Sequence, residues 1–281
     1  MRTKPERGGY MFKGSEYAYY AMYLVGFAIM MVVNLKTYKK YELKKSSAVI
    51  LTLITYVAGV TGALIMGDIH TAVHARFETT SSNVAIFGAV LFTPMFMTVA
   101  ALLFGKSWRK VMDLLAPGIF IILTCAKFGC FMAGCCAGRE SSFLGVYNPR
   151  LELTVFPSQL FESITMLAVV GFCFWYAFKF KGYKSGTVYP VVASVYSVTR
   201  FFWEFMRYYA YEEMRHIMFG LSFWQFMCIT VIVLSAVWLA ILRIPKLAAA
   251  EEKYYIGYAE KLNKFKTRNE KNIVHHKKKK K

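Results

Sequence analysis

The sequence predicts an all-α integral membrane protein of about seven transmembrane helices, on three observations. The chain is 57% hydrophobic and only 18% charged, with a mean hydropathy of +0.38. This composition is too apolar for a soluble domain. Apolar residues are also grouped into runs long enough to cross a bilayer, and the connectors between these runs alternate between basic and mixed charge.

Seven apolar stretches match the roughly 20 residues that a helix needs to cross hydrocarbon about 30 Å thick. They lie near residues 17–35, 48–66, 83–104, 111–136, 158–180, 186–207 and 218–243. The fourth stretch is the least regular, because Lys127 and several glycines in its last third favour a break in the helix. We expect an external N-terminal segment (1–16), one membrane domain (17–243) and a basic cytoplasmic tail (244–281).

Charge in the connectors predicts the orientation, because Lys and Arg are enriched on the cytoplasmic side. The connectors after the first, third and fifth stretches are basic, and so is the tail, which ends in five lysines. The intervening connectors mix acidic and basic residues. This alternation places the N-terminus outside and the C-terminus in the cytoplasm. The net charge of +19 does not indicate nucleic-acid binding, since the basic residues lie between apolar runs or in the tail.

Four of the six cysteines fall in one short stretch, as Cys125, Cys130, Cys135 and Cys136. Paired C-x-x-C units and added histidines are missing, so we interpret them as small residues filling a helix end and expect no metal or cofactor. His70 and His74 lie four residues apart in the predicted connector after the second stretch. On a helix they would share a face and could act as acid–base groups, although histidines in exposed loops are commoner.

Ionisable residues inside a membrane span are costly unless they are paired or hydrated, so each is a candidate functional residue. Lys127 lies past the midpoint of the fourth stretch, and Gln159 and Glu162 begin the fifth. The sixth ends with polar residues on one helical face, Tyr196, Arg200, Glu204 and Arg207. All of these fall in the outer half of the bilayer. They indicate either a structural ion pair or a site for an anionic phospholipid head group.

Five short motifs, in order, resemble the prolipoprotein diacylglyceryl transferase family over about residues 83–240. AKFGCFMAGCCAGR at 126–139 is similar to the family signature G-R-I-G-N-F-x-N-G-E-x-x-G-R, with Gly129, Gly134 and Arg139 among the matches. DLLAP at 113–117, FPSQLFE at 156–162 and YSVTRFFWEFMR at 196–207 resemble three further family motifs. Leu221, Ser222 and Gln225 match the family's L-S-x-x-Q segment.

The resemblance implies transfer of diacylglycerol from phosphatidylglycerol to the lipobox cysteine of a preprolipoprotein, with release of glycerol phosphate, in the plasma membrane of a bacterium. Arg200 would hold the phosphate and Glu204 would orient it, with Lys127 beside them and His74 as a candidate base. The implied substrate-binding residues are Arg139, Gln159, Glu162, Tyr196, Arg207, Gly129 and Gly134.

Several polar positions of the family pattern are changed in this chain. Lys127 replaces the signature arginine, Cys130 an asparagine and Cys135 a glutamate, while Phe87 stands where the family has a histidine. A base from the loop, help from Lys127 or a different chemistry would each account for these changes. The alternatives are therefore a divergent paralogue that binds phospholipid without this activity, or one that uses another acceptor. A small transporter is disfavoured, because the charges lie at one face of the membrane.

Overall fold

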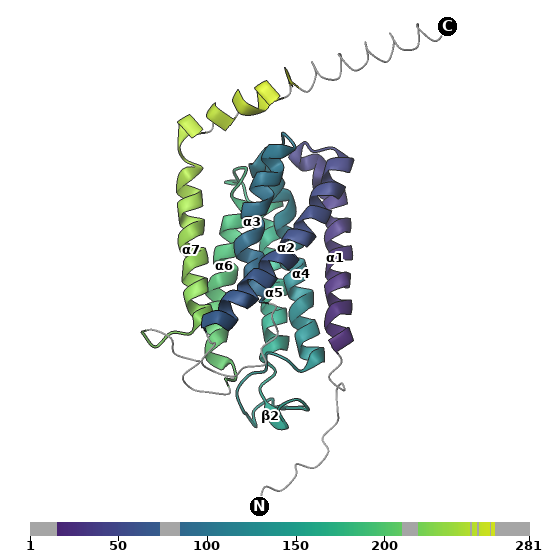
Figure 1. The fold of residues 1–281 in the computed structure, drawn as a ribbon, viewed down its shortest axis with the longest axis vertical. Helices are drawn as coiled ribbons and strands as arrows, with labels where there is room; N and C mark the ends of the chain where they lie inside the picture. The colour runs from purple at the N-terminus through teal and green to yellow at the C-terminus, as the bar shows by residue number, and fades with distance from the viewer. Residues whose placement is uncertain are drawn as a thin grey trace, which may run out of the picture.

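The computed structural model describes residues 16–73, 85–209, 219–247, 249–251, 253–258 and 260–261. Helices dominate the fold, as predicted, and a small sheet lies at one end of the bundle (Figure 1). The elements in chain order are α1 (Glu16–Thr37), the 3-10 helix η1 (Tyr38–Tyr41), α2 (Lys45–Val73), α3 (Ile86–Leu103), α4 (Trp108–Ala133), β1 (Val146–Asn148), β2 (Leu153–Val155), α5 (Ser158–Phe178), α6 (Val188–Trp203), the 3-10 helix η2 (Glu204–Met206) and α7 (Phe223–Ile241).

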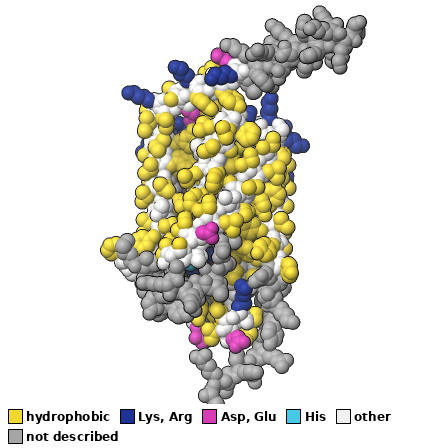
Figure 2. Space-filling view, in the orientation of Figure 1, with side chains coloured by type: hydrophobic (Ala, Val, Ile, Leu, Met, Phe, Trp, Pro, Cys, Tyr) yellow, Lys and Arg dark blue, Asp and Glu magenta, His cyan; other side chains and the backbone are white. Residues whose placement is uncertain are grey.

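The outer face of the bundle is apolar. Val57, Met95 and Leu167 each expose 62% of their surface, and Figure 2 shows apolar side chains covering the flank between two more polar ends. A water-soluble protein rarely exposes so large an apolar surface. Within the described residues, six helices are long and apolar enough to cross a membrane: α1 with η1, α2, α3, α4, α5 and α7. The chain is a multi-pass membrane protein.

α6 is shorter than the span predicted for this part of the chain. It has 16 residues, whereas a helix crossing the hydrocarbon needs about 20. η2 follows it directly, so the helical path continues to Met206. The predicted count of seven depends on whether α6 and η2 together cross the bilayer, and it stays a prediction.

α4 is the central helix of the bundle. It packs against α1, α3, α5 and α6, and most of its side chains are buried. The expected break near Lys127 does not occur, because the helix continues to Ala133. Gly129 permits close packing instead: a Cβ at this position would lie 3.1 Å from the Cα of Tyr19 on α1. Gly129 therefore serves helix packing, and Lys127 is held in a regular helix.

Asp113 on α4 fixes the start of α6. Its carboxylate accepts hydrogen bonds from the backbone N–H groups of Gly186 (2.6 Å) and Val188 (3.0 Å) and from the Tyr183 hydroxyl (2.6 Å). A carboxylate satisfies the free N–H groups at a helix N-terminus and suits the local dipole. This contact explains the DLLAP motif and sets the position of the helix that carries Arg200.

The basic connectors meet at one end of the bundle. Lys110 in the first turn of α4 pairs with Glu42 directly after η1 at 2.5 Å, and the Lys40 side chain lies 3.8 Å from the ring centre of Phe178 at the end of α5. The chain after α7 returns to the same end, where Glu251 pairs with Arg109 at 2.5 Å. Four segments with an excess of positive charge are therefore gathered opposite the end where α5 and α7 begin (Figure 1).

Candidate functional site

The site lies at the end of α4, where a turn reverses the chain. Gly134 ends the helix in the left-handed conformation (φ 69°), which glycine adopts without a steric penalty. The N–H of Gly134 donates to Phe131 O (3.2 Å) and that of Cys135 to Cys130 O (3.1 Å), the hydrogen-bond pattern of a Schellman cap. This cap holds the signature segment in a compact turn near Lys127.

Charged side chains from α4, α5, α6 and η2, with Arg207 directly after η2, form one buried network. Glu162 Oε2 lies 2.5 Å from Lys127 Nζ and 3.7 Å from Arg200 Nε. Glu204 Oε2 lies 2.6 Å from Arg200 Nη2 and 3.9 Å from Arg207 Nε. The predicted convergence of these residues is confirmed. Three cations meet two anions, so the network keeps one positive charge in excess.

Glu204 is further anchored by two hydroxyl donors. The Ser222 hydroxyl donates to Glu204 Oε1 at 3.2 Å, and the Tyr209 hydroxyl donates to the same oxygen. Burial raises the pKa of Tyr209, and the neighbouring carboxylate acts in the same direction, so the hydroxyl remains a donor. Ser222 also forms a capping box with Gln225 at the start of α7. The L-S-x-x-Q segment thus connects α7 to the charged network.

A cavity of about 920 Å³ opens beside this network. Its size falls within the range of small-molecule sites, roughly 300–1,000 Å³. The polar and aromatic residues that line it include His70, Lys127, Cys130, Cys135, Cys136, Tyr196, Arg200, Arg207, Tyr209 and Trp224. Arg200 Nη1 is buried in this wall and has no hydrogen-bond acceptor among the described residues. A buried guanidinium N–H without an acceptor, in a network with excess positive charge, suits an anionic ligand.

Phe87 on α3 occupies an aromatic wall of the cavity. Its ring centre lies 5.6 Å from that of Tyr196 and 6.1 Å from that of Trp224. The His70 ring stacks on Trp224 at 4.7 Å, so an imidazole lies near Phe87 but on a different helix. His70 is in α2, not in a connector, because α2 extends to Val73. The position predicted for His70 was therefore wrong, and His74 lies outside the described residues.

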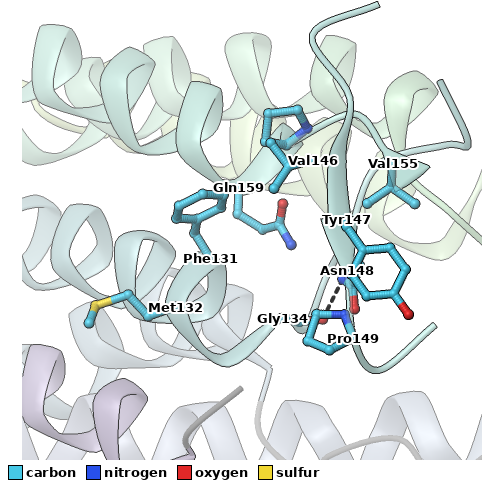
Figure 3. A pocket seen from close by; sticks show the side chains of 10 residues that line it. Phe131, Met132, Gly134, Val146, Tyr147, Asn148, Pro149, Val155 and Gln159 are labelled. Carbon is cyan, nitrogen blue, oxygen red and sulfur yellow. Dashed lines mark hydrogen bonds between the residues drawn. The ribbon is translucent and has the colours of Figure 1, made fainter. Parts of the chain in front are cut away.

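Gln159 supports the turn from its outer side. Its Nε2 donates to Cys135 O at 2.6 Å, and the Asn148 amide on β1 donates to Gly134 O at 2.8 Å. Figure 3 shows the Asn148 side chain bonded to Gly134, and Gln159 between Phe131 and the strand that carries Asn148. The antiparallel pair of β1 and β2, with Val146 opposite Val155, carries Asn148 into place. Gln159 lines this small hollow, whereas Glu162, less than one turn further on, faces the charged network.

Besides Gln159, two expected substrate-binding residues lie outside the cavity. Arg139 exposes its side chain and joins the fold through its backbone, donating to Met206 O at 2.9 Å. Gly129 lies at the contact between α1 and α4. Lys127, Gly134, Tyr196, Arg200 and Arg207 do line the cavity, and Glu162 and Glu204 hold its cations.

Among the residues that were not expected in the site, Cys130, Cys135 and Cys136 lie together. Their Sγ atoms all lie within 4.8 Å of one another, at the edge of the cavity. The spacing C-x4-C-C does not match a zinc motif. The glycine directly before Cys135 is the one available signal, because a glycine after a helix predicts a Schellman cap that returns the chain onto the last turn.

Comparison with known proteins agrees with these motifs. The family model for prolipoprotein diacylglyceryl transferase matches residues 13–241. A Clostridium perfringens protein named phosphatidylglycerol–prolipoprotein diacylglyceryl transferase 2 is 29% identical over 175 residues, which cover 59% of this chain and 68% of that protein. A Clostridium tetani protein named phosphatidylglycerol–prolipoprotein diacylglyceryl transferase is 25% identical over 205 residues, covering 68% of this chain and 80% of the relative. With the family model matched across the bundle and the site, the chain belongs to the prolipoprotein diacylglyceryl transferase family.

Proposed function

We propose that this protein transfers the diacylglyceryl group of phosphatidylglycerol to the lipobox cysteine thiol of a preprolipoprotein and releases glycerol phosphate. The observation that carries the proposal is the buried Arg200, whose Nη1 has no acceptor among the described residues and lies in the wall of a cavity large enough for a lipid head group. The names of the two clostridial relatives support the choice of both substrates.

Arg200 binds the phosphate that leaves during the reaction. Glu162 and Glu204 hold its Nε and Nη2 from two sides, which leaves Nη1 for a phosphate oxygen. Lys127 and Arg207 add positive charge in the same cavity. Preorganised cations stabilise the growing negative charge of the leaving group without reorganising during the reaction. Tyr196 and Gly134 shape the cavity, and Gln159 supports it by holding the turn.

The protein lies in the plasma membrane of a bacterium with seven spans, the seventh being α6 continued by η2. The basic end faces the cytoplasm, so the N-terminus is outside and the C-terminus inside. This orientation puts the cavity in the outer half of the bilayer, where the lipobox of an exported precursor becomes accessible.

Phe87 favours a second candidate, a phospholipid-binding paralogue without transfer activity. An apolar ring stands at the position of the family histidine, in contact with Tyr196 and Trp224. Such a protein would keep the lipid site after losing the chemistry.

One experiment separates the two candidates. Purified protein in detergent is incubated with phosphatidylglycerol and a lipobox peptide, and both glycerol phosphate release and lipid binding are measured. The proposal predicts release that requires the peptide cysteine and is absent with a Cys→Ser peptide. Phosphatidylglycerol binding without release, beside an active control transferase, supports the paralogue and rejects the proposed transfer.

A further inference from the structure

Cys130, Cys135 and Cys136 form a cluster of three thiols, called here the thiol cluster. Their Sγ atoms lie within 4.8 Å of one another, and all three residues line the cavity that holds Arg200 and Lys127. None of the three is in a disulfide. The other cysteines of the chain, Cys125, Cys173 and Cys228, do not belong to this cluster.

The backbone builds this cluster. The Schellman cap at Gly134 places Cys135 over Cys130, since the Cys135 N–H donates to Cys130 O. Cys136 follows with a positive φ of 58°, a conformation that a side-chain-bearing residue rarely adopts, and this turns its side chain back toward the other two. Gln159 and Ser158 hold the turn by donating to the carbonyl oxygens of Cys135 and Cys136. The cluster is therefore fixed by the C-terminal cap of α4 and by the first two residues of α5.

Three thiolates at this spacing suit a tetrahedral zinc ion. Zn–S bonds of about 2.3 Å put the sulfur atoms roughly 3.8 Å apart, so small side-chain rotations bring the cluster into geometry. Zinc sites that take part in a reaction keep three protein ligands and leave the fourth position open. Because all three cysteines line the cavity, an open fourth position on an ion held there would be reached from the cavity.

The cavity also provides a partner for that open position. The lipobox cysteine must enter the same space, since it has to reach a lipid held by Arg200. A thiol that binds zinc loses its proton, and the thiolate is the nucleophilic form of cysteine. Three thiolates and Zn²⁺ carry one negative charge and a fourth thiolate adds a second, beside a buried network that holds one positive charge in excess.

We propose that the thiol cluster binds Zn²⁺ and that this ion takes the acceptor cysteine as its fourth ligand, thereby activating it in place of a general base. This inference rests on the proposed transferase function. It also accounts for two departures from the family pattern together: Phe87 removes the histidine, and Cys130 and Cys135 supply sulfur where the signature has asparagine and glutamate.

The acceptor thiol releases its proton to water when it binds Zn²⁺. Its sulfur then attacks the glyceryl carbon that carries the phosphate ester, so a C–S bond forms while the C–O bond breaks. Both electrons of that C–O bond leave with glycerol phosphate, whose new negative charge is stabilised by Arg200. No oxidant, reductant or second co-substrate is needed.

The first test measures zinc binding without any reference to activity. Full-length protein in detergent, kept reduced with a phosphine, is stripped of metal, dialysed against Zn²⁺ and analysed for metal content. We expect one Zn²⁺ per chain in the wild type and in the matched control Cys125→Ala, and loss in Cys135→Ala and Cys136→Ala. Unfolding curves check that each variant is folded. A folded wild type that binds no Zn²⁺, or cluster variants that still bind it, would overturn the proposal.

The second test asks whether the acceptor occupies the fourth position. Co²⁺ replaces Zn²⁺ as a spectroscopic probe, and lipobox peptides with cysteine or serine are added. The sulfur-to-cobalt charge-transfer intensity should rise by about one third with the cysteine peptide, from three thiolates to four, and stay constant with the serine peptide. An unchanged spectrum with both peptides rejects thiol activation by the metal.

A third measurement separates this proposal from the proposed function. Zinc-loaded and zinc-depleted proteins are assayed for peptide lipidation. Transfer that persists undiminished after zinc removal overturns the zinc role while the transferase function stands. Stoichiometric Zn²⁺ and a cobalt response to the peptide, without any lipidation, retain the metal site but reject the transferase function.

Discussion

Glu162 on α5 and Lys127 on α4 form a buried ion pair, with Oε2 and Nζ 2.5 Å apart and side chains only 2% and 4% exposed. The pair joins the central helix to the helix that follows the small sheet. Glu162 Oε2 also lies 3.7 Å from Arg200 Nε. Glu162 therefore links the stability of the bundle to the orientation of Arg200, the residue proposed to bind the phosphate.

Lys127→Met should destabilise the fold because it leaves Glu162 buried with one partner fewer. Breaking a buried pair in this way costs about 3–5 kcal/mol. Unfolding in mixed detergent and SDS micelles measures this free energy. The double variant Lys127→Met, Glu162→Gln should recover part of the loss, and a single variant as stable as wild type would show that the pair is not a structural link.

Arg200→Lys should leave the protein folded but lower turnover by about 10²-fold or more, because an ammonium cannot bind Glu162, Glu204 and a phosphate in one planar arrangement. Steady-state release of glycerol phosphate provides the measurement. Arg243→Lys is the matched control, since Arg243 is exposed beyond the end of α7. Equal rates for Arg200→Lys and wild type would remove the phosphate role from Arg200.

The spans and the gathering of charge could be predicted from the sequence. Long apolar runs and costly intramembrane charges are strong signals, and they located Lys127, Glu162, Arg200 and Glu204 correctly as one group. The end of α6 could not be read in this way: the predicted span continues to residue 207, whereas the α-helix ends at Trp203 and a 3-10 turn follows it. His70 was misplaced for a similar reason, since α2 continues beyond its most apolar stretch.

The thiol cluster and the end of the chain were harder to predict. Cys130 and Cys135 meet through backbone hydrogen bonds of a helix cap, a signal carried by Gly134 and not by cysteine spacing. Beyond α7, Tyr255 accepts a hydrogen bond from the Trp108 N–H at 3.1 Å and Glu251 pairs with Arg109. These contacts join residues far apart in the sequence. The sequence of the lysine-rich tail alone therefore gives no indication of them.

The proposed orientation predicts which end of the bundle is accessible from outside the cell. Glu140→Cys, beside β2 at the end of the bundle opposite the basic connectors, should react with a membrane-impermeant maleimide on intact cells, above the background of the unsubstituted chain. Lys39→Cys, in the first basic connector, should react only after the cells are opened. Both side chains are exposed in the fold, so the side of the membrane on which each one lies decides whether it reacts. The reverse pattern would invert the topology.

Phe87→His should make transfer less dependent on zinc. The new imidazole would stand beside Tyr196, where the family has its histidine, and a positioned base contributes about 10²–10⁴-fold. The measurement is lipidation by zinc-depleted protein, in which the variant should exceed the wild type. If both zinc-depleted proteins are equally inactive while the variant still binds phosphatidylglycerol, an imidazole at this position cannot replace the metal.

The most direct measurement is the mass spectrum of a lipobox peptide after incubation with purified, zinc-loaded protein and phosphatidylglycerol. Transfer predicts a mass increase of one diacylglyceryl group, located on the cysteine through a thioether and absent from the serine peptide. An unmodified cysteine peptide, recovered beside protein that is folded and has bound phosphatidylglycerol, would contradict the proposed transfer.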